Sequence, residues 1–574
     1  MANFTTSPGV AISEVDNTYL TGQPVQAGAA IIGPTVKGPV ENPILVTSYS
    51  DFVTIFGDTF ISGGQAQSYL TSIAAYNYFN YGGTSLLVAR VVTESANWSS
   101  AQSTTISSYL NATSASFVLE TISEGLIMNN SGSNTLGSNG TLNSGSENNV
   151  RWEITNSNTG SGTFNVLVRR GNDTENNKVV LEAWNNLTLD PNSNRYISQV
   201  IGDQVLNYSS ATNQMELSGS YTNNSKYIRV RSVNLSTPNY FDANGVAISA
   251  YTASIPVNGS GSAGGSFTGA IGTVNSTINL YDIISTNTQG LIGASYNNMI
   301  SLLGNPEAYQ FNLLFAPGLT NDNHTAQVTN IINNTIARGD SMYVVDLVDY
   351  NSTVSEVVTQ AQSRDTSYAA AYWPWVRIID PATGRQVWVP ASTVIPGVYA
   401  FNDKVSAPWF APAGINRGGL NTVLQAQLKL TQGNRDTLYS NNINPIATLP
   451  KQGVVVYGQK TLQKSQSALD RVNVRRLMIE LKSYIKQIAD TVVFEQNTIT
   501  TRNSFIARVT PFLEGIQQKQ GLYAYKVVMD DTNNGPAVID QNQLIGQIYI
   551  QPTRTAEFIS LDFILMPTGA EFPG

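Results

Sequence analysis

The sequence predicts a multidomain α+β fold, and three observations support this. A chain of 574 residues is too long to bury one hydrophobic core. Apolar strand-like runs alternate with helix-like runs over 23–95 and again over 291–460, the order that builds a parallel sheet covered by helices. The chain between these two parts is rich in Ser, Asn, Thr and Gly, which favours β-rich domains with long loops.

The composition excludes several classes of site. Cysteine is absent, which excludes a disulfide framework and a thiolate metal site, and the single histidine, His324, excludes a cluster of histidine ligands. We therefore expect no metal and no cofactor. No apolar run reaches the roughly 18 residues of a membrane-spanning helix, and the N-terminus lacks the features of a signal peptide.

Residues 1–22 are predicted to form an extended arm. Val10 and Ile12 alternate with small or polar residues, and the segment is too short to build a core of its own. An edge strand of its own domain is the alternative.

Residues 23–95 are predicted to start an α/β domain. The run AGAAIIG reads as a buried strand, and Ser50 is a candidate N-cap for a short helix that carries Phe52 and Phe56. A longer helix then ends at a Gly-Gly pair and is followed by the strand SLLVARVV, so a parallel crossover unit is expected. The run GPTVKGP lacks the spacing of a phosphate-binding loop.

Residues 96–150 are predicted to be an outer β-rich insertion, and residues 151–290 a second β-rich outer domain. The first contains no Lys or Arg, and a disordered insertion is the alternative there, although the alternating run SFVLETIS favours a strand. In the second, strands are expected at RWEIT, TFNVLVRR and KVVLEAWNNLTLD, and a helix at NRYISQVIGD.

Residues 291–460 are predicted to complete the α/β domain. Buried strands are expected at FNLLFAPG and SMYVVDLVDY, and helices at VTNIINNTIARGD and STVSEVVTQAQSR, the latter with Ser352 as a candidate cap. The run WVRIIDPATGRQVWVP predicts a β-hairpin around a Pro/Gly turn. The neighbouring aromatic residues Tyr372, Trp373 and Trp375 are interpreted as packing residues.

The predicted C-terminal domain, 461–574, opens with an amphipathic helix over about 468–497. Six apolar residues at steps of three, four and seven share one arc of this helix: Val474, Leu477, Leu481, Ile485, Ile488 and Val492. Four basic residues share a second arc roughly 100° away: Arg471, Arg475, Lys482 and Lys486.

The region around this helix is basic within an acidic protein. From Lys451 to Lys526 there are 12 Lys or Arg against 5 Asp or Glu, a balance of +7, whereas the whole chain carries −8. Such a local excess of positive charge predicts an acidic partner.

A second helix and three strands are predicted to follow. The helix covers 501–520, and Pro511 is expected to kink it or to restart it at Thr510. The strands are LYAYKVVMD, LIGQIYIQP and AEFISLDFILMP. The DDTNNG run at Asp530 lacks the ligand spacing of an EF-hand loop and is interpreted as a hairpin turn.

Many separate motifs of this chain occur in the order found in one known family. Near the N-terminus they are SPGVAISEVD, AAIIGPTVKGPVENPILVTSYSDFVTIFGD and YFNYGGTSLLVARVV. In the middle they are SYAAAYWPWVRIIDPATG, VPASTVIPGVYAFND and APWFAPAGINRGGL. Towards the C-terminus they are LYSNNINPI, GVVVYGQKTL, LDRVNVRRLMIELKSYI, VFEQNTITTR and VVMDDTNNGP. Together they resemble the tail sheath proteins of contractile-tailed bacteriophages, whereas 96–290 matches that family only weakly.

The resemblance implies a fold. Residues 23–95 and 291–460 would form a subtilisin-like α/β sheath domain without protease function, and 461–574 a small α+β domain with strand-exchanging terminal arms. His324 lies in the polar run TNDNHTAQ with no Ser or Asp motif beside it, so it is interpreted as a solvated loop residue and not as a catalytic base. We therefore expect no enzymatic activity.

The resemblance also implies an assembly. The chain would form a homo-oligomer of six-fold rings, stacked into a helical sheath around a tail tube, with tail tube, baseplate and tail terminator or neck proteins as partners. It would be part of the virion, made in the host bacterial cytoplasm, with no direct contact to nucleic acid and no membrane insertion. Contraction would drive the tube through the host envelope for genome delivery.

Two sets of residues carry this expectation. Strand exchange between subunits is assigned to Val10, Ile12, Glu14, Ile559, Leu561 and Phe563, because an unpaired sheet edge accepts an added strand. A core strand of the home sheet is the alternative for the last three. The basic arc of Arg471, Arg475, Lys482 and Lys486 would face an acidic tube, and the alternatives are a solvated helix face or pairing with a neighbouring sheath subunit.

Two other functions remain open at this point. The sheath of a pyocin-like particle or of another contractile injection system would have the same architecture. A glycan-binding or glycan-hydrolysing β-rich surface protein is a more distant alternative, which would require a pocket with paired carboxylates or exposed aromatic residues.

Overall fold

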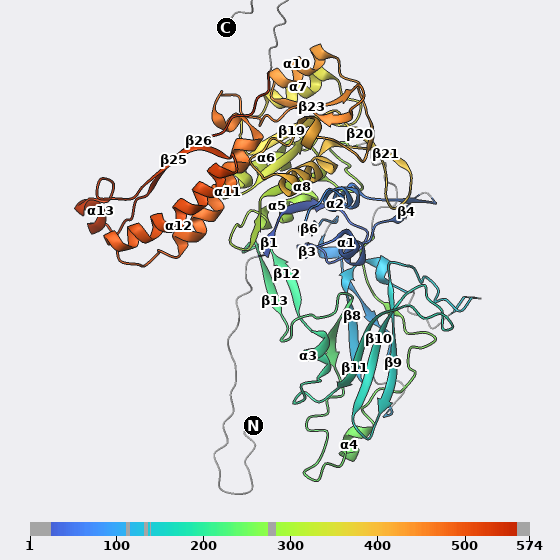
Figure 1. The fold of residues 1–574 in the computed structure, drawn as a ribbon. Helices are drawn as coiled ribbons and strands as arrows, with labels where there is room; N and C mark the ends of the chain where they lie inside the picture. Colours follow the sequence, from blue (N-terminus) through green and yellow to red (C-terminus); the bar gives the residue numbers. More distant parts are fainter. Residues whose placement is uncertain are drawn as a thin grey trace, which may run out of the picture.

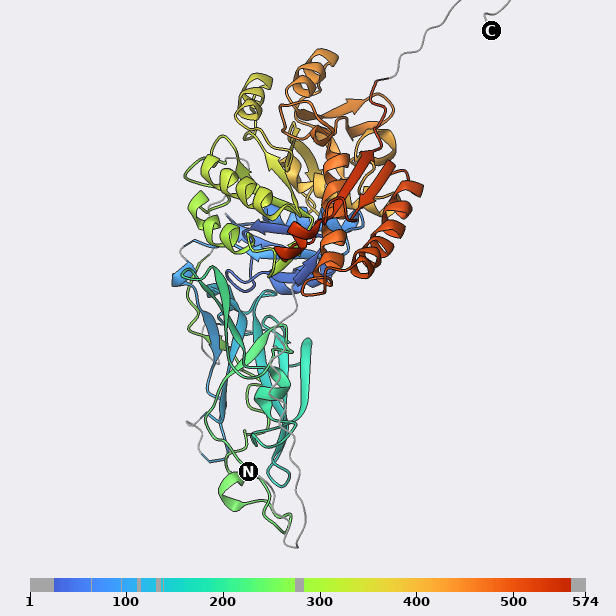
Figure 2. The ribbon, with the colours of Figure 1, turned by 90° about the vertical axis from the view of Figure 1, so that its left-hand side faces the viewer.

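The structure is a computed structural model, and it describes residues 25–558 except 63, 94, 111–114, 131–135, 138 and 274–282. An α/β body, residues 25–93 and 283–460, forms one end of the molecule (Figure 1). An outer domain rich in strands, residues 95–273, extends away from it, as Figure 2 shows from the side. A C-terminal domain, residues 461–558, lies against the flank of the body.

The α/β body is built on an eight-stranded sheet of order β24-β23-β19-β18-β17-β2-β6-β3. In that order the strands are Gly453–Val456, Ile443–Leu449, Ala369–Trp373, Met342–Asp346, Leu313–Thr320, Ala29–Gly33, Leu86–Arg90 and Ile44–Val46. The inner strands are parallel, and each edge strand is antiparallel to its neighbour. The predicted crossover is confirmed, because β2 pairs with β6 in parallel.

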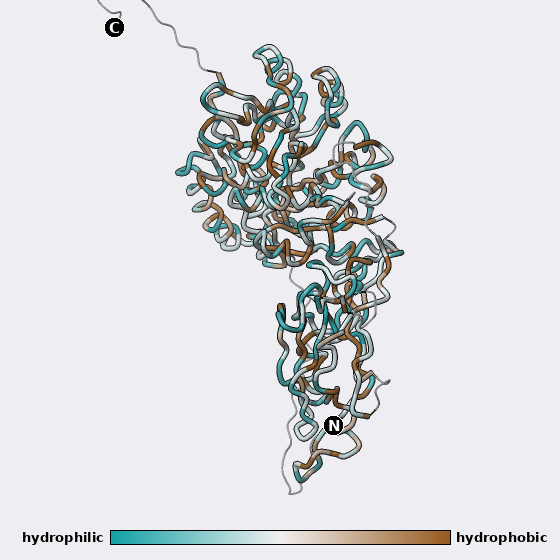
Figure 3. Tube along the Cα trace, turned by 90° about the vertical axis from the view of Figure 1, so that its right-hand side faces the viewer, coloured by the Kyte–Doolittle hydropathy of each residue, from teal (hydrophilic) through white to brown (hydrophobic). Residues whose placement is uncertain are grey.

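Helices cover both faces of this sheet, since alternate residues of a buried strand point to opposite sides. Ala29 and Ile31 pack with α1, α2 and α8, whereas Ala30 and Ile32 pack with α5, α6, α7 and α10. In chain order these helices are α1 Tyr49–Phe56, α2 Leu70–Asn80, α5 Asn297–Leu302, α6 Thr325–Arg338, α7 Val354–Gln362, α8 Ile395–Val405 and α10 Gln432–Ser440. Figure 3 shows hydrophobic segments running through the inside of the body.

Two helix caps differ from those that the sequence predicts. The N-cap of α1 is Ser48 and not Ser50, because the Ser48 side chain accepts a hydrogen bond from the Asp51 amide at 3.1 Å. The N-cap of α7 is Thr353 and not Ser352, because Thr353 and Glu356 form a reciprocal capping box.

Smaller elements complete the body. The predicted hairpin is confirmed as β20 and β21, and β22 pairs with β20 on its other side. Tyr372, Trp373 and Trp375 are all buried, as expected for packing residues. The remaining elements are β1 Val25–Ala27, β4 Phe60–Ser62, β5 Gln65–Gln67, β16 Tyr309–Phe311, β20 Val376–Ile379, β21 Gln386–Val389, α9 Gly414–Arg417 and β22 Val423–Ala426.

The outer domain has one hydrophobic core, formed by residues from Ala101 to Ala270. Its sheets have the orders β11-β10-β9, β14-β8-β7-β15 and β12-β13. The elements are β7 Ser100–Ser103, β8 Phe117–Glu124, β9 Val150–Asn158, β10 Thr163–Arg170, β11 Val180–Thr188, α3 Ile197–Ile201, β12 Val205–Ser209, β13 Gln214–Ser218, β14 Ile228–Val233, α4 Ser249–Thr252 and β15 Phe267–Thr268. Strands on both sides of residue 150 pair with each other, so the division predicted there does not separate two cores.

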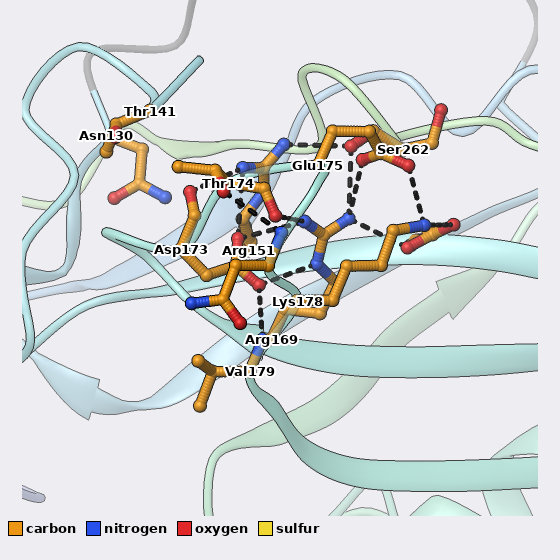
Figure 4. Close-up of polar contacts among 12 residues, drawn as sticks. Asn130, Thr141, Arg151, Arg169, Asp173, Thr174, Glu175, Lys178, Val179 and Ser262 are labelled. Atoms are coloured by element: carbon orange, nitrogen blue, oxygen red, sulfur yellow. Dashed lines mark hydrogen bonds and ion pairs between the residues drawn. The ribbon is translucent and has the colours of Figure 1, made fainter. Parts of the chain in front are cut away.

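Buried charges hold the strands of the outer domain together (Figure 4). The cluster contains three cations and three anions: Arg151, Arg169, Lys178, Glu153, Asp173 and Glu175. Arg169 Nε and Nη2 donate to the two carboxylate oxygens of Asp173 at 2.8 and 2.9 Å, and Nη1 donates to Glu153 at 2.8 Å. The side chains of Arg169 and Asp173 are fully buried, so this pairing compensates charges that water cannot reach.

The outer domain is attached to the body where β6 meets β8. Arg90 is fully buried, and its Nη1 donates to the Glu124 carbonyl at 3.1 Å and also to the carbonyl of Gly38. Ser123 Oγ accepts from the Gly38 amide at 2.7 Å, and the Glu124 carboxylate accepts from the Val40 amide at 3.0 Å. Burial lowers the pKa of Arg90 to about 10, so the guanidinium remains charged at neutral pH.

The C-terminal domain consists of α11 Val472–Asp490, α12 Ile499–Gln518, β25 Leu522–Val528, α13 Pro536–Asp540 and β26 Gln547–Pro552. Helix α12 is capped by Thr498 and continues through Pro511, so it is not restarted at Thr510. The first two predicted strands are present as β25 and β26, whereas most of AEFISLDFILMP lies outside the described residues. Among the helices that the structure describes, none combines the length and apolarity that a membrane crossing requires.

Candidate functional site

The C-terminal domain combines a layer of two helices with a small sheet. Leu477 and Leu481 of α11 and Val509 of α12 form a core with Leu522 of β25. The antiparallel sheet places Tyr525 opposite Ile550 and Val527 opposite Ile548, and these four residues pack on the helices. One face of the sheet is therefore covered, while Tyr523 and Tyr549 remain 77% and 56% exposed.

Within the residues that the structure describes, both outer edges of this sheet are unpaired. Strands β25 and β26 pair only with each other within the described part of the chain. Two strands alone are marginally stable in water, and each open edge presents unpaired backbone amides and carbonyls. The geometry can therefore accept further strands while the helical layer supports them.

The residues assigned to strand exchange lie outside the described residues. They are Val10, Ile12, Glu14, Ile559, Leu561 and Phe563. Their role stays a prediction.

Two residues of the basic arc of α11 are exposed, and the other two contact other parts of the chain. Lys482 and Lys486 are exposed, and Lys482 Nζ lies 3.3 Å from the hydroxyl of Tyr368. Arg471 is half-buried, and its Nε donates to Glu557 at 2.8 Å.

The expectation that Arg475 presents its charge on the surface is wrong for this subunit. Arg475 is 5% exposed, its guanidinium lies 4.0 Å from the centre of the Tyr368 ring, and it donates to Ser367 Oγ. Burial lowers the pKa of Arg475. The chain that leads into β19 covers the first turns of α11, and helical periodicity does not reveal such a tertiary contact.

Sequence reasoning missed the residues that hold α11 on the body. Arg476 forms a two-point ion pair with Asp403 of α8, with Nη1 at 2.8 Å from Oδ1, and its guanidinium lies 4.8 Å from the ring of Tyr399. It also missed Glu557, which Arg471 binds. The only sequence signal was the Arg475-Arg476 pair, which places two charges side by side in the half of the helix that packs on the body.

The body offers a further place to test for chemistry, the carboxyl ends of β2 and β17. The order of the strands reverses between them, and open α/β sheets bind ligands at such a point. Here Gln289 fills it: Nε2 donates to the Pro317 carbonyl at 3.0 Å, and Oε1 accepts from the Leu70 amide at 2.9 Å. Leu70 opens α2, so Gln289 occupies the position where a helix N-terminus would bind an anion.

The space left beside Gln289 is small. The cavity measures about 20 Å³ and is lined by residues such as Thr35, Tyr69 and Trp98. That volume holds about one water molecule. Gln289, itself almost fully buried, therefore fills this crevice.

His324 is not the solvated loop residue that the sequence predicts, because it is 2% exposed. It precedes α6, and its Nδ1 accepts from the Thr320 amide at 3.3 Å. Burial lowers the pKa of His324. Ser392 and Asp346 form a separate buried pair. The Ser392 amide donates to one carboxylate oxygen of Asp346 at 3.1 Å, and the Ser392 hydroxyl donates to the other. His324 makes its hydrogen bond to the backbone, so it is not positioned as a base for Ser392.

Metal ligands are not brought together either. In the residues that the structure places, no three His, Asp or Glu side chains are grouped so that they could hold a metal ion. Asp530 instead accepts from the amide and hydroxyl of Thr532, as expected for a turn.

Comparison with known proteins gives matches over the second half of the chain. Residues 289–462 match the family described as the phage tail sheath protein central domain, and residues 464–565 match the phage tail sheath C-terminal domain. The tail sheath protein of Vibrio phage KVP40 is 39% identical over 220 residues, and that of Enterobacteria phage T4 is 42% identical over 229 residues.

These alignments are partial for both partners. They cover 38% and 40% of this chain, and 33% and 35% of the two relatives, about a third of their length. Among solved structures, the sheath tail protein of Listeria innocua aligns over 92% of this chain and 95% of its own, with a TM-score of 0.51 and 10% identity. That likeness concerns the mixed α+β fold alone.

Proposed function

Because the chain belongs to the phage tail sheath protein family, we propose that it is the subunit of a contractile tail sheath. Subunits polymerise as stacked six-fold rings around a tail tube. Contraction of this lattice drives the tube through the host envelope for genome delivery. The role is structural and belongs to the virion.

The observation that carries this proposal is the two-stranded sheet with two open edges, supported by α11 and α12. Arms from neighbouring subunits add strands to it, through Val10, Ile12 and Glu14 at one end of the chain and Ile559, Leu561 and Phe563 at the other. Backbone hydrogen bonds then join subunits, and subunits joined through their arms could rotate as rigid bodies without losing their connection.

We infer that the α/β body is the subtilisin-like sheath domain, without protease function. Its parallel sheet between two helical layers supports this inference. Gln289 fills the crevice where such sheets bind ligands. In this proposal, contraction draws its free energy from packing between subunits. A few kcal/mol per subunit, a fraction of one domain's stability, becomes large when it is summed over a lattice.

The tube contact rests on Lys482 and Lys486, the two residues of the basic arc that are exposed. Exposed ion pairs contribute about 0–1 kcal/mol each, which suits an interface that must release on contraction. Baseplate and tail terminator proteins contact the first and last rings.

Electron microscopy of the purified full-length protein tests the proposal. We expect it to polymerise into tubes with six-fold rings, without added nucleotide. Truncations that remove 1–22 or 559–574 should leave the unfolding temperature of the subunit unchanged and abolish the tubes. A full-length protein that stays monomeric, or truncated chains that polymerise as readily, would contradict the proposal.

A further inference from the structure

Glu557 is held by three donors from distant parts of the chain. Its Oε1 accepts from Arg471 Nε at 2.8 Å and from Gln459 Nε2 at 3.1 Å, and its Oε2 accepts from the Tyr439 hydroxyl at 2.7 Å. The Glu557 side chain is 17% exposed. Both oxygens of one carboxylate are thus bound in a site that no pattern in the sequence predicts.

Glu557 lies between the last strand of the small sheet and the C-terminal segment. Strand β26 ends at Pro552, and the chain then leaves the small sheet. Asn473 Nδ2 donates to Thr555 Oγ1 at 3.2 Å along the way. Glu557 follows, immediately before the C-terminal segment that carries Ile559, Leu561 and Phe563.

Two of the three donors belong to the α/β body. Tyr439 lies on α10, and Gln459 follows β24. Tyr439 is held in turn by Lys460, whose Nζ donates to the Tyr439 carbonyl at 2.8 Å. The side chain of Asn444 in β23 binds the backbone of Lys460 twice. Its Oδ1 accepts from the Lys460 amide at 2.6 Å, and its Nδ2 donates to the Lys460 carbonyl at 2.7 Å. The carboxylate of Glu557 is therefore connected to the eight-stranded sheet by a short chain of hydrogen bonds.

We propose that Glu557 is the anchor of the C-terminal arm, and that the site formed by Tyr439, Gln459 and Arg471 is its receptor. The inference rests on the proposed function, in which this arm joins the next subunit. Tension from that subunit reaches Glu557 before it reaches β26. It passes into the body, and the marginal β25–β26 pair is not pulled apart strand from strand.

The electrostatics of the site agree with this role. Burial alone would raise the pKa of Glu557, but the bonds from Arg471, Tyr439 and Gln459 outweigh it and lower the pKa. The carboxylate is therefore ionised throughout the neutral range. Charge-assisted hydrogen bonds are roughly twice as strong as neutral ones, and Arg471 supplies that charge. This assignment also gives Arg471 a partner within its own subunit and removes it from the tube-facing set.

Hydrogen exchange of the purified full-length subunit tests the anchor. The substitution Glu557→Gln keeps the shape of the side chain and removes its charge, and Tyr439→Phe removes one donor without touching the arm. Both should accelerate exchange within residues 553–558 at Thr553, whose amide donates to the Gly521 carbonyl at 3.2 Å, by about tenfold or more, the equivalent of about 1.4 kcal/mol. Exchange over β25, residues 522–528, should not change. Glu495→Gln is the matched control, because Glu495 is exposed, and it should leave both regions unaltered.

Two results would overturn the anchor. Unchanged exchange over 553–558 in Glu557→Gln would mean that the contacts do not hold the arm. An equal acceleration over 522–528 would mean that Glu557 supports the whole domain. Tube formation by the unmodified chain separates this test from the assignment of function: exchange effects without tubes would keep the anchor and remove the sheath role, and tubes without exchange effects would do the reverse.

Discussion

Asp346 and Arg169 show two ways in which this protein buries a charged side chain. Asp346 lies in the body, where Ser392 binds both of its carboxylate oxygens. Burial raises the pKa of Asp346 from 3.8 to about 7, against the effect of those bonds. Arg169 lies in the outer domain among three carboxylates. The Asp346 carboxyl becomes neutral as the pH falls through about 7, whereas the buried charge of Arg169 is compensated by its carboxylate partners.

The titration of Asp346 predicts a pH dependence. Since its pKa is higher in the folded chain than in the unfolded one, its contribution to stability is complete below about pH 4 and is lost as the pH rises through about 7. Three pKa units correspond to about 4 kcal/mol at most. Asp346→Asn should match the natural chain in unfolding temperature at about pH 4 and exceed it increasingly up to pH 8, as measured by differential scanning fluorimetry. An equal difference at both pH values would contradict the titration.

The charge cluster of Figure 4 predicts a strong effect of one substitution. Arg169→Met leaves Asp173 and Glu153 buried with fewer partners, which should destabilise the outer domain by about 3–5 kcal/mol. Chemical denaturation followed by tryptophan fluorescence measures this. Arg231→Met is the matched control, because Arg231 is 52% exposed where it pairs with Glu120, and it should cost about 1 kcal/mol or less. Equal losses for the two variants would contradict the role of burial.

At the scale of elements, α11 shows how far sequence patterns extend. The apolar arc predicts correctly that Leu477 and Leu481 are buried, because periodicity determines which residues share a face. The same reasoning failed for Arg475, since Tyr368 covers it from more than a hundred positions away in the chain. The predicted N-caps of α1 and α7 were wrong for a local reason. Neighbouring Ser and Thr residues are equally good candidates in the sequence, and the backbone conformation decides which of them caps the helix.

In the proposed sheath, the exposed residues Lys482 and Lys486 of α11 would contact the tail tube, and this role can be tested. The double variant Lys482→Glu, Lys486→Glu should still form empty tubes but should bind purified tail tube more weakly, by up to about 1 kcal/mol for each ion pair removed. Co-sedimentation at increasing salt measures this, and binding by the natural chain should weaken as salt rises. Lys429→Glu with Lys464→Glu makes the same change in charge elsewhere on exposed positions. If that pair weakened binding equally, α11 would not be the surface that binds the tube.

At the scale of the whole molecule, the outer domain and the body were separable in sequence, but the interior of the outer domain was not. The shift in composition at about residue 96 corresponds to the end of the body. The boundary at residue 150 had no such physical basis, because the pairing of β8 with β14 joins segments a hundred residues apart. Local patterns predict strands, whereas their pairing depends on contacts that sequence spacing does not specify.

The single core of the outer domain predicts that a fragment of residues 95–273 folds by itself. All buried members of that core lie within it. The fragment loses its contacts with the body, among them the hydrogen bonds at Arg90, Gly38 and Val40 and the ion pair between Lys226 and Asp51. Circular dichroism should show a cooperative thermal transition. A fragment of 95–150 alone should remain unfolded, since it lacks the partners of β7 and β8. An unfolded 95–273 would show that the body is required for folding.

The side chain of Gln289, fixed between β17 and the start of α2, has a consequence for the proposed sheath. A fold that closes its own ligand crevice has no inlet for chemical fuel there. In the sheath role proposed above, the work of contraction would then be stored when the subunits assemble, as in a spring that is wound once. A sheath of this kind would contract once and would not be reset.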